Sequence, residues 1–463
     1  MNSKNFTAGS AKVNITPSLG TIINGDFVSH YARYVHDPLF AKALVMQSGE
    51  VIMAIIVVDI CVMDAGFIKG VKATITEKAC ISESNILISS THTHAAGSVT
   101  DLLLGTTDLA YRQKLPSLIV EAVLLAKQNF RPAQIAFGSV DAQEHVVCRR
   151  YFMKDGFVSL NPVTQVAEKI KTNPIGAEDK IERRVAAPDT QLSFLGVRGI
   201  DGRWISLVGN YSLHYVGDWE QGTISADYFG VFSNSLQKKL EADDSFVAMM
   251  SNGTSGDVNI WDFCDIDRYP TKLFEKCEFI GCDLAEKVFL ALKNVTWDSN
   301  PSLLVKYIEL PVAIRKPSSD EIELSIRLME ETDFENIVID QDGLQRLYAR
   351  EQLLLNEYPE TVHVPIQVFG VGYGTIGALS GEFFSETGLW LKEKSSSNHY
   401  FTISMANGYH GYVPPAHEIE LGGYETWTCR SSYLERNAEN KIRNKLLSLM
   451  KSINNTQEIA EVI

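Results

Sequence analysis

Two histidines directly after a short apolar run are the residues most able to do chemistry together. The run 85–88 predicts a buried strand, after which the chain turns polar and carries His92 and His94. Open α/β sheets place ligands at such strand ends. If the segment stays extended, residues two apart project from the same side, so both imidazoles would face one space. One ring could bind a metal and the other face a substrate. The alternative is a pair of histidines satisfied by ordinary hydrogen bonds.

Three further places share this pattern of an apolar strand followed by a residue that can bind a metal. They supply His214, Glu382, which we expect at the start of a helix, and Tyr412. Zinc takes imidazole nitrogen and carboxylate oxygen, and a catalytic site keeps one position for water. Taken singly, each residue more often has a structural role, as a core histidine, a helix-capping carboxylate or a core tyrosine. Spacing cannot show whether they meet, because about 320 residues separate His92 from Tyr412.

The elements that would position these residues alternate between strands and helices. The segment 11–17 ends in a proline and predicts an edge strand. Further strands are predicted at 41–46, 51–60, 134–140, 191–197, 204–208, 246–250, 362–371, 375–379 and 401–405. Helices are predicted at 67–80, 111–127, 227–240, 272–292, 319–330, 345–355 and 432–450. The length alone suggests two or three domains. With no repeat or linker, we expect instead one α/β domain over residues 1–463, a large mixed sheet with helices packed outside.

Composition and charge restrict the classes of molecule that the protein is expected to bind. Lys and Arg number 42 against 57 Asp and Glu, and this net charge of −15 argues against nucleic acid or an anionic membrane surface. The longest apolar stretch, 51–63, contains Asp59 and is too short to span a bilayer, so no membrane span is expected. The N-terminus shows no signal peptide, and the seven cysteines form no CxxC pair. We therefore expect reduced thiols and a cytoplasmic location.

Several motifs, in the right order, resemble the catalytic domain of the neutral/alkaline (non-lysosomal) ceramidase family. They are Ser89-Ser-Thr-His-Thr-His94, Asn210-Tyr-Ser-Leu-His214 with Ile224-Ser-Ala-Asp227, Gly256-Asp-Val-Asn259, Gly381-Glu-Phe383 and Ala406-Asn-Gly-Tyr-His-Gly-Tyr-Val413. The resemblance runs from about residue 8 to 450, and its opening and late segments resemble short bacterial members that lack a C-terminal immunoglobulin-like domain. It implies a neutral-ceramidase-like fold.

The resemblance also implies roles for individual residues. A zinc ion (Zn²⁺) would be held by His92, His214, Glu382 and Tyr412. His94 would line the site, Arg149 would lie near the substrate, with Arg150 as a one-step alternative, and Tyr424 would be a second site tyrosine. Zinc polarises a scissile carbonyl or lowers the pKa of its water to about 7. His94, Arg149 and Tyr424 could then stabilise the oxyanion or donate a proton.

One position departs from the family pattern. The family loop reads Gly-Asp-Val-Ser-Pro-Asn and its serine is regarded as the nucleophile, but this chain has Asn259 there. Asparagine cannot serve as that nucleophile, and nothing places Ser255 or Thr254 at the right point. We therefore expect direct attack by zinc-activated water, with Asn259 hydrogen-bonding substrate or water. Asp257 is expected to orient the loop or a ligand histidine.

Three functions remain open at this stage. The favoured one is a zinc-dependent hydrolase that cleaves an N-acyl (amide) bond of a small molecule, either an N-acyl lipid or a carbohydrate derivative. The second is a zinc-dependent glycosidase or lyase acting on a sugar-like substrate, which Trp219, Trp261 and Trp427 near the candidate loops would suit. The third is a non-catalytic binding protein. It predicts a degraded metal set, whereas all four ligand types remain.

Overall fold

A mixed eight-stranded sheet forms the centre of the computed structural model, which describes residues 6–334 and 336–462. Its strands are β1 (Thr7–Asn14), β5 (Phe40–Ser48), β6 (Val51–Val58), β7 (Ile86–Ser90), β8 (Arg131–Asp141), β13 (Gln191–Gly199), β14 (Trp204–Tyr211) and β16 (Val247–Asn252). They lie in the order β16-β14-β13-β8-β1-β5-β6-β7. The β5–β6 and β13–β14 hairpins pair antiparallel, each joined by a short turn that carries glycine.

A second, four-stranded sheet lies against the first. It consists of β18 (Leu303–Ala313), β19 (Thr361–Val371), β20 (Gly374–Leu379) and β22 (Tyr400–Ile403), in that order. The strand β18 was not predicted, because Lys306 and Glu309 interrupt its apolar residues and it lies half-exposed at the sheet edge. It nevertheless pairs with β19 along its whole length.

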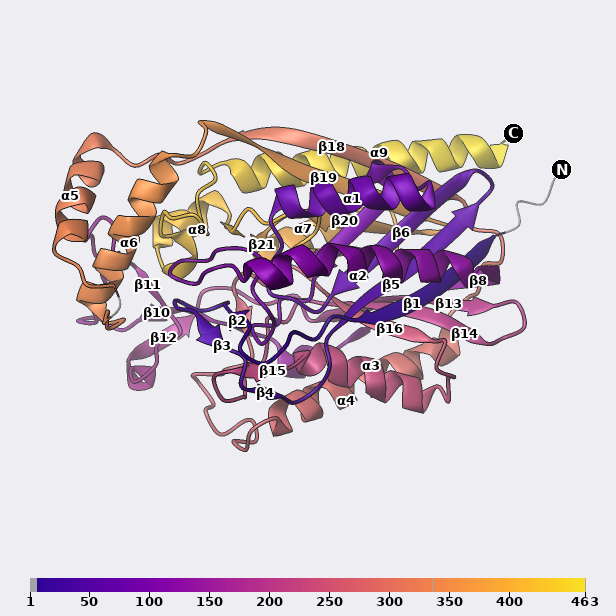
Figure 1. Cartoon of the computed structure of the whole chain (residues 1–463), viewed down its shortest axis with the longest axis horizontal. Coiled ribbons are helices and arrows are strands. Elements are labelled where there is room, and N and C mark those ends of the chain that lie inside the picture. The colour runs from indigo at the N-terminus through magenta and orange to yellow at the C-terminus, as the bar shows by residue number, and fades with distance from the viewer. Residues whose placement is uncertain (1–5, 335, 463) are drawn as a thin grey trace.

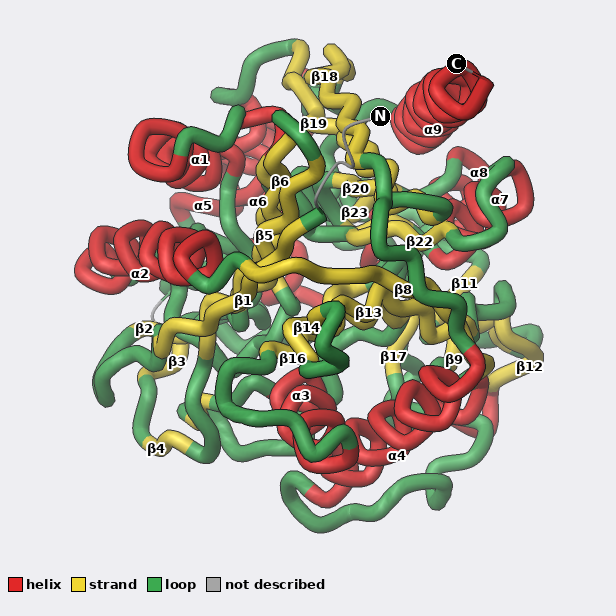
Figure 2. The backbone as a smooth tube through the Cα atoms, turned by 90° about the vertical axis from the view of Figure 1, so that its right-hand side faces the viewer, coloured by secondary structure: helices red, strands yellow, loops and turns green. Residues whose placement is uncertain are grey.

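Helices cover both outer surfaces, which gives four layers (Figures 1 and 2). The helices α1 (Ala65–Ala79), α2 (Leu109–Gln128), α3 (Asp227–Lys239) and α4 (Glu275–Ala291) pack on one face of the large sheet. The small sheet packs on the other face through a shared apolar core, and α9 (Ala438–Val462) covers the far side of the small sheet. The α/β fold class with a large mixed sheet and outer helices is thereby confirmed. None of the described helices is both long and apolar enough to cross a bilayer.

The remaining elements lie around the ends of the two sheets. The two helices predicted at 319–330 and 345–355 are α5 (Ser319–Glu330) and α6 (Gln341–Asn356), which form a hairpin at one end of the molecule (Figure 1). The shorter elements are β2 (Ile22–Ile23), β3 (His30–Tyr31), β4 (Tyr34–Val35), β9 (Val147–Cys148), β10 (Arg150–Met153), β11 (Ile170–Thr172), β12 (Ile181–Arg184), β15 (Thr223–Ile224), β17 (Val258–Asn259), β21 (Glu382–Phe383), β23 (Tyr412–Val413), α7 (Ser385–Lys394) and α8 (Ala416–Leu421).

Two predictions about these elements are wrong. The first strand is not an edge strand, because β1 lies between β8 and β5. It pairs with β8 only at Thr7 and Ala8, so its later residues alternate in exposure much as an edge strand does. Glu382 does not begin a helix either: it lies on β21, which pairs with β23, and the helix α7 begins three residues later.

Candidate metal centre and active site

The predicted site residues follow strands whose carboxyl ends lie together. Within the eight-stranded and four-stranded sheets, three pairs of neighbouring strands are parallel, β6 with β7, β14 with β16, and β20 with β22. Backbone hydrogen bonds join the pairs beyond their ends, from Ser404 N to Asn252 O at 2.9 Å and from Asn407 N to Ile88 O at 2.7 Å. Segments far apart in the sequence are thereby brought together where each chain turns polar.

Three of the predicted metal ligands form one buried cluster. The Oε2 atom of Glu382 lies 3.5 Å from His92 Nε2 and 3.9 Å from His214 Nε2. The ligand atoms of the three residues lie within 4.8 Å of one another, and each residue is at most 5% exposed. Among the described residues, Glu382 Oε2 has no hydrogen-bond partner. Ligands of a tetrahedral ion at about 2.0–2.1 Å lie about 3.3 Å apart. The cluster therefore fits a metal ion.

The backbone turns sharply at His92, so the condition that the segment stays extended is not met. His92 has a φ of 72°, and its Nδ1 lies 2.9 Å from the carbonyl oxygen of Cys61. Because a carbonyl only accepts, Nδ1 carries a proton, so Nε2 is the ring nitrogen left to bind an ion once it is deprotonated. Burial lowers the pKa of His92, but Cys61 and Glu382 outweigh burial and raise it.

His94 lies beside the cluster, although the backbone that leads to it turns at His92 instead of staying extended. Its Nε2 is 3.2 Å from His92 Nε2, and its ring stacks on Tyr215 at 3.7 Å. Gly25 lies against the same ring: a Cβ atom there would be 2.6 Å from the His94 ring, and its φ of 145° favours glycine. Burial, followed by nearby positive charge, lowers the pKa of both His94 and His214. Both imidazoles are therefore neutral, the form that binds metals.

Glu382 and Tyr412 are direct partners in the parallel pair β21–β23. Register partners project to the same side, which places the Tyr412 ring beside the carboxylate. The hydroxyl of Tyr409 donates to Glu382 Oε1 at 2.9 Å, and burial would raise the pKa of Glu382 but His92 and Arg149 lower it overall. Tyr409 was not predicted as a site residue, although it lies within the motif Ala406–Val413.

Arg149 reaches the site and Arg150 does not. The Arg149 guanidinium lies 5.4 Å from the centre of the Tyr412 ring, and its Nε donates to Glu425 Oε1 at 2.7 Å. The ring of Tyr424 is 5.6 Å from that of Tyr412. Arg150 turns away and binds Glu418 and the second oxygen of Glu425. Glu425, which the sequence analysis did not identify, thus holds both arginines in place.

The loop after β16 does not bring its polar side chains to the histidines. The Asn259 amide donates to Asn173 Oδ1 at 2.7 Å and accepts from Trp261 N at 2.9 Å, so it is bonded within its surroundings. Asp257 accepts from Ser385 N at 2.7 Å at the start of α7, and burial raises its pKa to about 6. Ser255 donates to Asn252. Asp257 therefore holds the loop to α7 rather than orienting a histidine.

The three tryptophans lie in different surroundings. Trp219 lies 6.1 Å from Tyr215, which stacks on His94. Trp427 is buried and donates to Glu168, whereas Trp261 is 42% exposed on the surface. Trp219 is thus the tryptophan that ring contacts connect to the histidines.

Comparison with known proteins gives a consistent result. Residues 9–278 match the family described as neutral/alkaline non-lysosomal ceramidase, N-terminal. A crystal structure of neutral ceramidase from Pseudomonas aeruginosa is similar with a TM-score of 0.71 and 14% identity, over 98% of this chain and 75% of that one. A structure titled "Ceramidase complexed with C2" is similar with a TM-score of 0.70 and 13% identity, over 98% and 76%. None of the curated proteins compared matches the chain.

Proposed function

The chain belongs to the neutral/alkaline non-lysosomal ceramidase family, and on that premise we propose that it is a zinc-dependent hydrolase cleaving an N-acyl (amide) bond of a small lipid. The observation that carries the proposal is the unpartnered oxygen of Glu382 between the Nε2 atoms of His92 and His214. A buried carboxylate oxygen that faces two imidazole nitrogens at 3.5 and 3.9 Å, longer than ordinary hydrogen bonds, is arranged for a shared cation.

The proposed ligands are His92, His214 and Glu382, with Tyr412 as the fourth through its register with Glu382. A bound zinc ion would polarise the amide carbonyl and lower the pKa of a water molecule. The chain itself orients the ligands. The Cys61 carbonyl accepts from His92 Nδ1 and the Tyr409 hydroxyl donates to Glu382 Oε1, so His92 Nε2 and Glu382 Oε2 are the atoms that face the cluster. Such supporting contacts fix both the tautomer and the direction of a ligand.

The remaining polar groups have separate roles in this proposal. His94, neutral and beside His92, accepts a proton from the attacking water and returns it to the leaving amine. Arg149 and the Tyr424 hydroxyl stabilise negative charge that develops on the carbonyl oxygen. Asn259 shapes its loop through Asn173 and Trp261, and Asp257 fixes that loop to α7.

One observation favours the alternative, a glycosidase or lyase with the same metal site. Tyr215 and Trp219 extend from His94 as neighbouring aromatic rings, and such rings commonly stack on sugar faces. A lipid chain or the base of a headgroup would also pack there. The two functions differ in which bond breaks, so direct product analysis separates them.

The test is hydrolysis of an N-acyl-sphingosine and of its O-glycosylated counterpart by the full chain, with fatty acid and free sugar measured separately. We expect fatty acid release by the wild type, loss by at least ~100-fold in His214→Ala, and full retention in His417→Ala, since removing one ligand abolishes a metal site. His417 is exposed and belongs to another group, with the exposed Glu386 and the buried Glu418, so it controls for general loss of histidine. Sugar release without fatty acid would overturn the amide proposal in favour of the alternative.

A further inference from the structure

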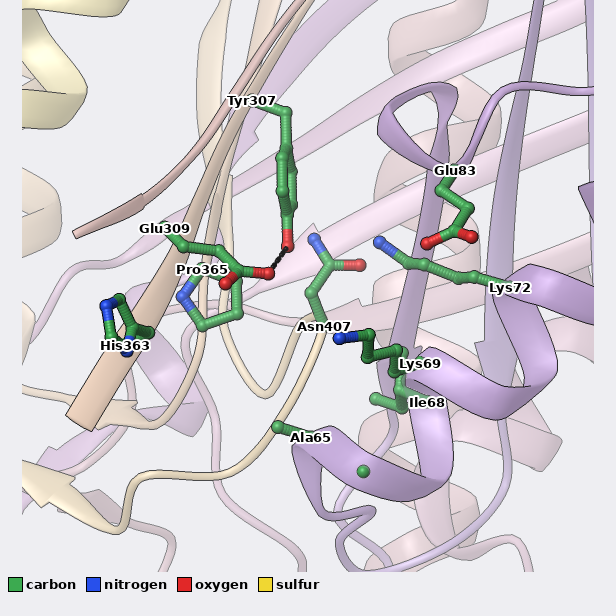
Figure 3. A pocket seen from close by; sticks show the side chains of 11 residues that line it. Ala65, Ile68, Lys69, Lys72, Glu83, Tyr307, Glu309, His363, Pro365 and Asn407 are labelled. Carbon is green, nitrogen blue, oxygen red and sulfur yellow. Dashed lines mark hydrogen bonds between the residues drawn. The ribbon is translucent and has the colours of Figure 1, made fainter. Parts of the chain in front are cut away.

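A pocket separate from the metal cluster lies between α1 and the edge of the small sheet (Figure 3). Its volume is about 220 Å³, and its lining includes Lys69 and Lys72 from α1, Glu83, and Tyr307 and Glu309 from β18. Because a water molecule in the liquid occupies about 30 Å³, the pocket holds a compound of several heavy atoms. The residues His92, His214 and Glu382 are not among those that line this pocket.

Lys72 is the unusual member of this lining. It occupies a core-facing position of α1 and is only 4% exposed, and its amine has no hydrogen-bond partner among the described residues. The amine lies 5.2 Å from the centre of the Tyr307 ring, which Figure 3 shows on the opposite side of the pocket. Burial lowers the pKa of Lys72 to about 7, with Glu83 and Glu309 opposing the shift. Much of the amine is therefore uncharged and nucleophilic at neutral pH.

The charges around the pocket restrict what it can bind. With Lys72 largely uncharged, Lys69 is the positive side chain named in the lining, and Glu83 and Glu309 are the negative ones. A free anion would be repelled by the two carboxylates, and a free cation by Lys69. An uncharged compound meets neither repulsion. Its recognition would then come from a bond to the Lys72 amine, which lacks a hydrogen-bond partner among the described residues.

We propose that this pocket captures small uncharged aldehydes, which Lys72 binds covalently and reversibly as an imine. The lone pair of Nζ forms a bond to the carbonyl carbon, and the carbonyl oxygen leaves as water together with the two amine protons. No oxidant, reductant or cofactor is needed. The rest of the aldehyde lies against the Tyr307 ring, and the exposed side chains of Lys69 and Glu83 move to admit it.

The experiment treats the full chain at pH 7.5 with propanal or benzaldehyde and reduces any imine with cyanoborohydride. Peptide mass mapping then locates the added mass. We expect Lys72 to react at least ~10-fold faster than Lys69, because an ordinary lysine with a pKa of about 10.4 is almost wholly protonated there. Lys69 is the internal control, since it is exposed and lies one turn earlier on the same helix. Equal or slower labelling of Lys72 in the wild type overturns the proposal without any variant.

Two further arms sharpen the result. Lys72→Met should lose the label at this peptide while Lys69→Met retains it, with folding of each verified by its melting temperature. Propionate, the anion matched to propanal, should give no protection of Lys72. Protection by propionate would instead identify an anion site and contradict aldehyde capture. Hydrolysis of N-acyl lipids is read out separately, so failure of either proposal leaves the other standing.

Discussion

Two neighbouring groups determine how the metal ligands present themselves. The Cys61 carbonyl accepts from His92 Nδ1, and the Tyr409 hydroxyl donates to Glu382 Oε1. Each contact engages one polar atom of the ligand and leaves the other facing the cluster. Since a ligand that is already oriented loses little freedom when an ion binds, these contacts would raise the affinity of the proposed site.

Tyr409→Phe tests this orientation without removing a ligand. Loss of the hydroxyl frees Glu382 Oε1, and we expect the affinity for zinc to fall by about 10–100-fold, the usual effect of removing a contact behind a ligand. Competition with a chromophoric chelator measures the change. Tyr400→Phe is the matched control, because that buried hydroxyl bonds to Thr402 on β22. Equal affinities of the two variants would contradict the role given to Tyr409.

Lys72→Met should stabilise the fold in a pH-dependent way. The pKa of Lys72 is about 7 in the folded chain, against an ordinary value of 10.5. The unfolded chain therefore binds more protons between pH 7 and 10.5, and wild-type stability rises with pH across that window as the penalty disappears. We expect the variant to be more stable by roughly 2–4 kcal/mol near pH 7, with the difference shrinking towards pH 10.

Denaturant unfolding at several pH values measures this difference. Lys69→Met, at an exposed position on the same helix, should show no such trend. The titratable side chains that line the same pocket are Glu83, Glu309, Tyr307, Lys69 and His363, and all of them are present in both the wild type and the variant. A stability difference that stays constant from pH 7 to 10 would contradict a neutral amine.

Site residues could be predicted from the sequence where metal binding restricts which residue types can serve. Histidine and glutamate after apolar runs indicated His92, His214 and Glu382, which the structure brings together. The contacts of Asn259 were not predictable, because its partner Asn173 lies in a loop with no pattern that links the two. Tyr409 and Cys61 were not predicted, because their ability to orient a ligand depends on where the fold places them and not on their residue type.

At the scale of elements, short strands and loops add residues to a site whose histidines follow long strands. The paired segments β21 and β23 bring Glu382 beside Tyr412. The segment around β2 and β3 crosses the site, where Gly25 contacts His94 and Phe27 lies 5.9 Å from Tyr424. This segment therefore closes one side of the site and restricts how His94 can lie.

Gly25→Ala should disturb His94 specifically. A Cβ atom at Gly25 would lie 2.6 Å from the His94 ring, which cannot yield without leaving its stack on Tyr215. We expect kcat/KM to fall at least ~10-fold, as a misplaced proton-transfer group does, with metal content unchanged. Gly20→Ala is the control, since its φ of 87° brings similar backbone strain but nothing lies within 4 Å of its Cβ. Equal activities of the two variants would contradict the role of His94.

Long, strongly patterned elements were well predicted, and short or edge elements were not. The helices α1 and α2 and the β5–β6 hairpin match their predicted ranges to within a few residues. The two-residue strand β21 cannot be seen in a sequence, because two residues hold no periodicity and their pairing partner lies thirty residues away. The edge strand β18 was missed because its exposed face carries charge.

At the scale of the whole molecule, the metal cluster lies where segments from both sheets meet. His92 and His214 follow strands of the large sheet, whereas Glu382 and Tyr412 follow strands of the small one. The sheets share one apolar core, which supports our proposal that residues 1–463 fold as one domain. An ion held by both sheets would therefore contribute to the stability of the entire fold.

Removal of the metal should lower the melting temperature. A ligand that binds only the folded state stabilises it by about 2.7 kcal/mol at a concentration of 100 Kd, so we expect a chelator to lower Tm by at least ~3 °C and added zinc to restore it. Calorimetry of the wild type should show one transition that moves as a unit. His214→Ala should not respond to the chelator, whereas His417→Ala should behave as the wild type. A chelator response that is equal in both variants would contradict the assignment.

The order of strands and the meeting of the two sheets could not be derived from the sequence. Apolar periodicity identifies a strand but does not say which strand lies beside it, so β1 was assigned to an edge although it lies inside the sheet. The net charge of −15 restricted the class of partner but carried no information on the layers. The resemblance to the ceramidase family indicated the overall fold, which periodicity alone could not.

The central claim is that His92, His214 and Glu382 hold a metal ion, and elemental analysis of purified protein tests it most directly. We expect about one zinc per chain in the wild type and in His417→Ala, and less than about a tenth of that in His214→Ala, because that variant keeps only one of the two imidazole ligands. The same low zinc content in wild type and His214→Ala, after zinc has been supplied and excess removed, would contradict the account.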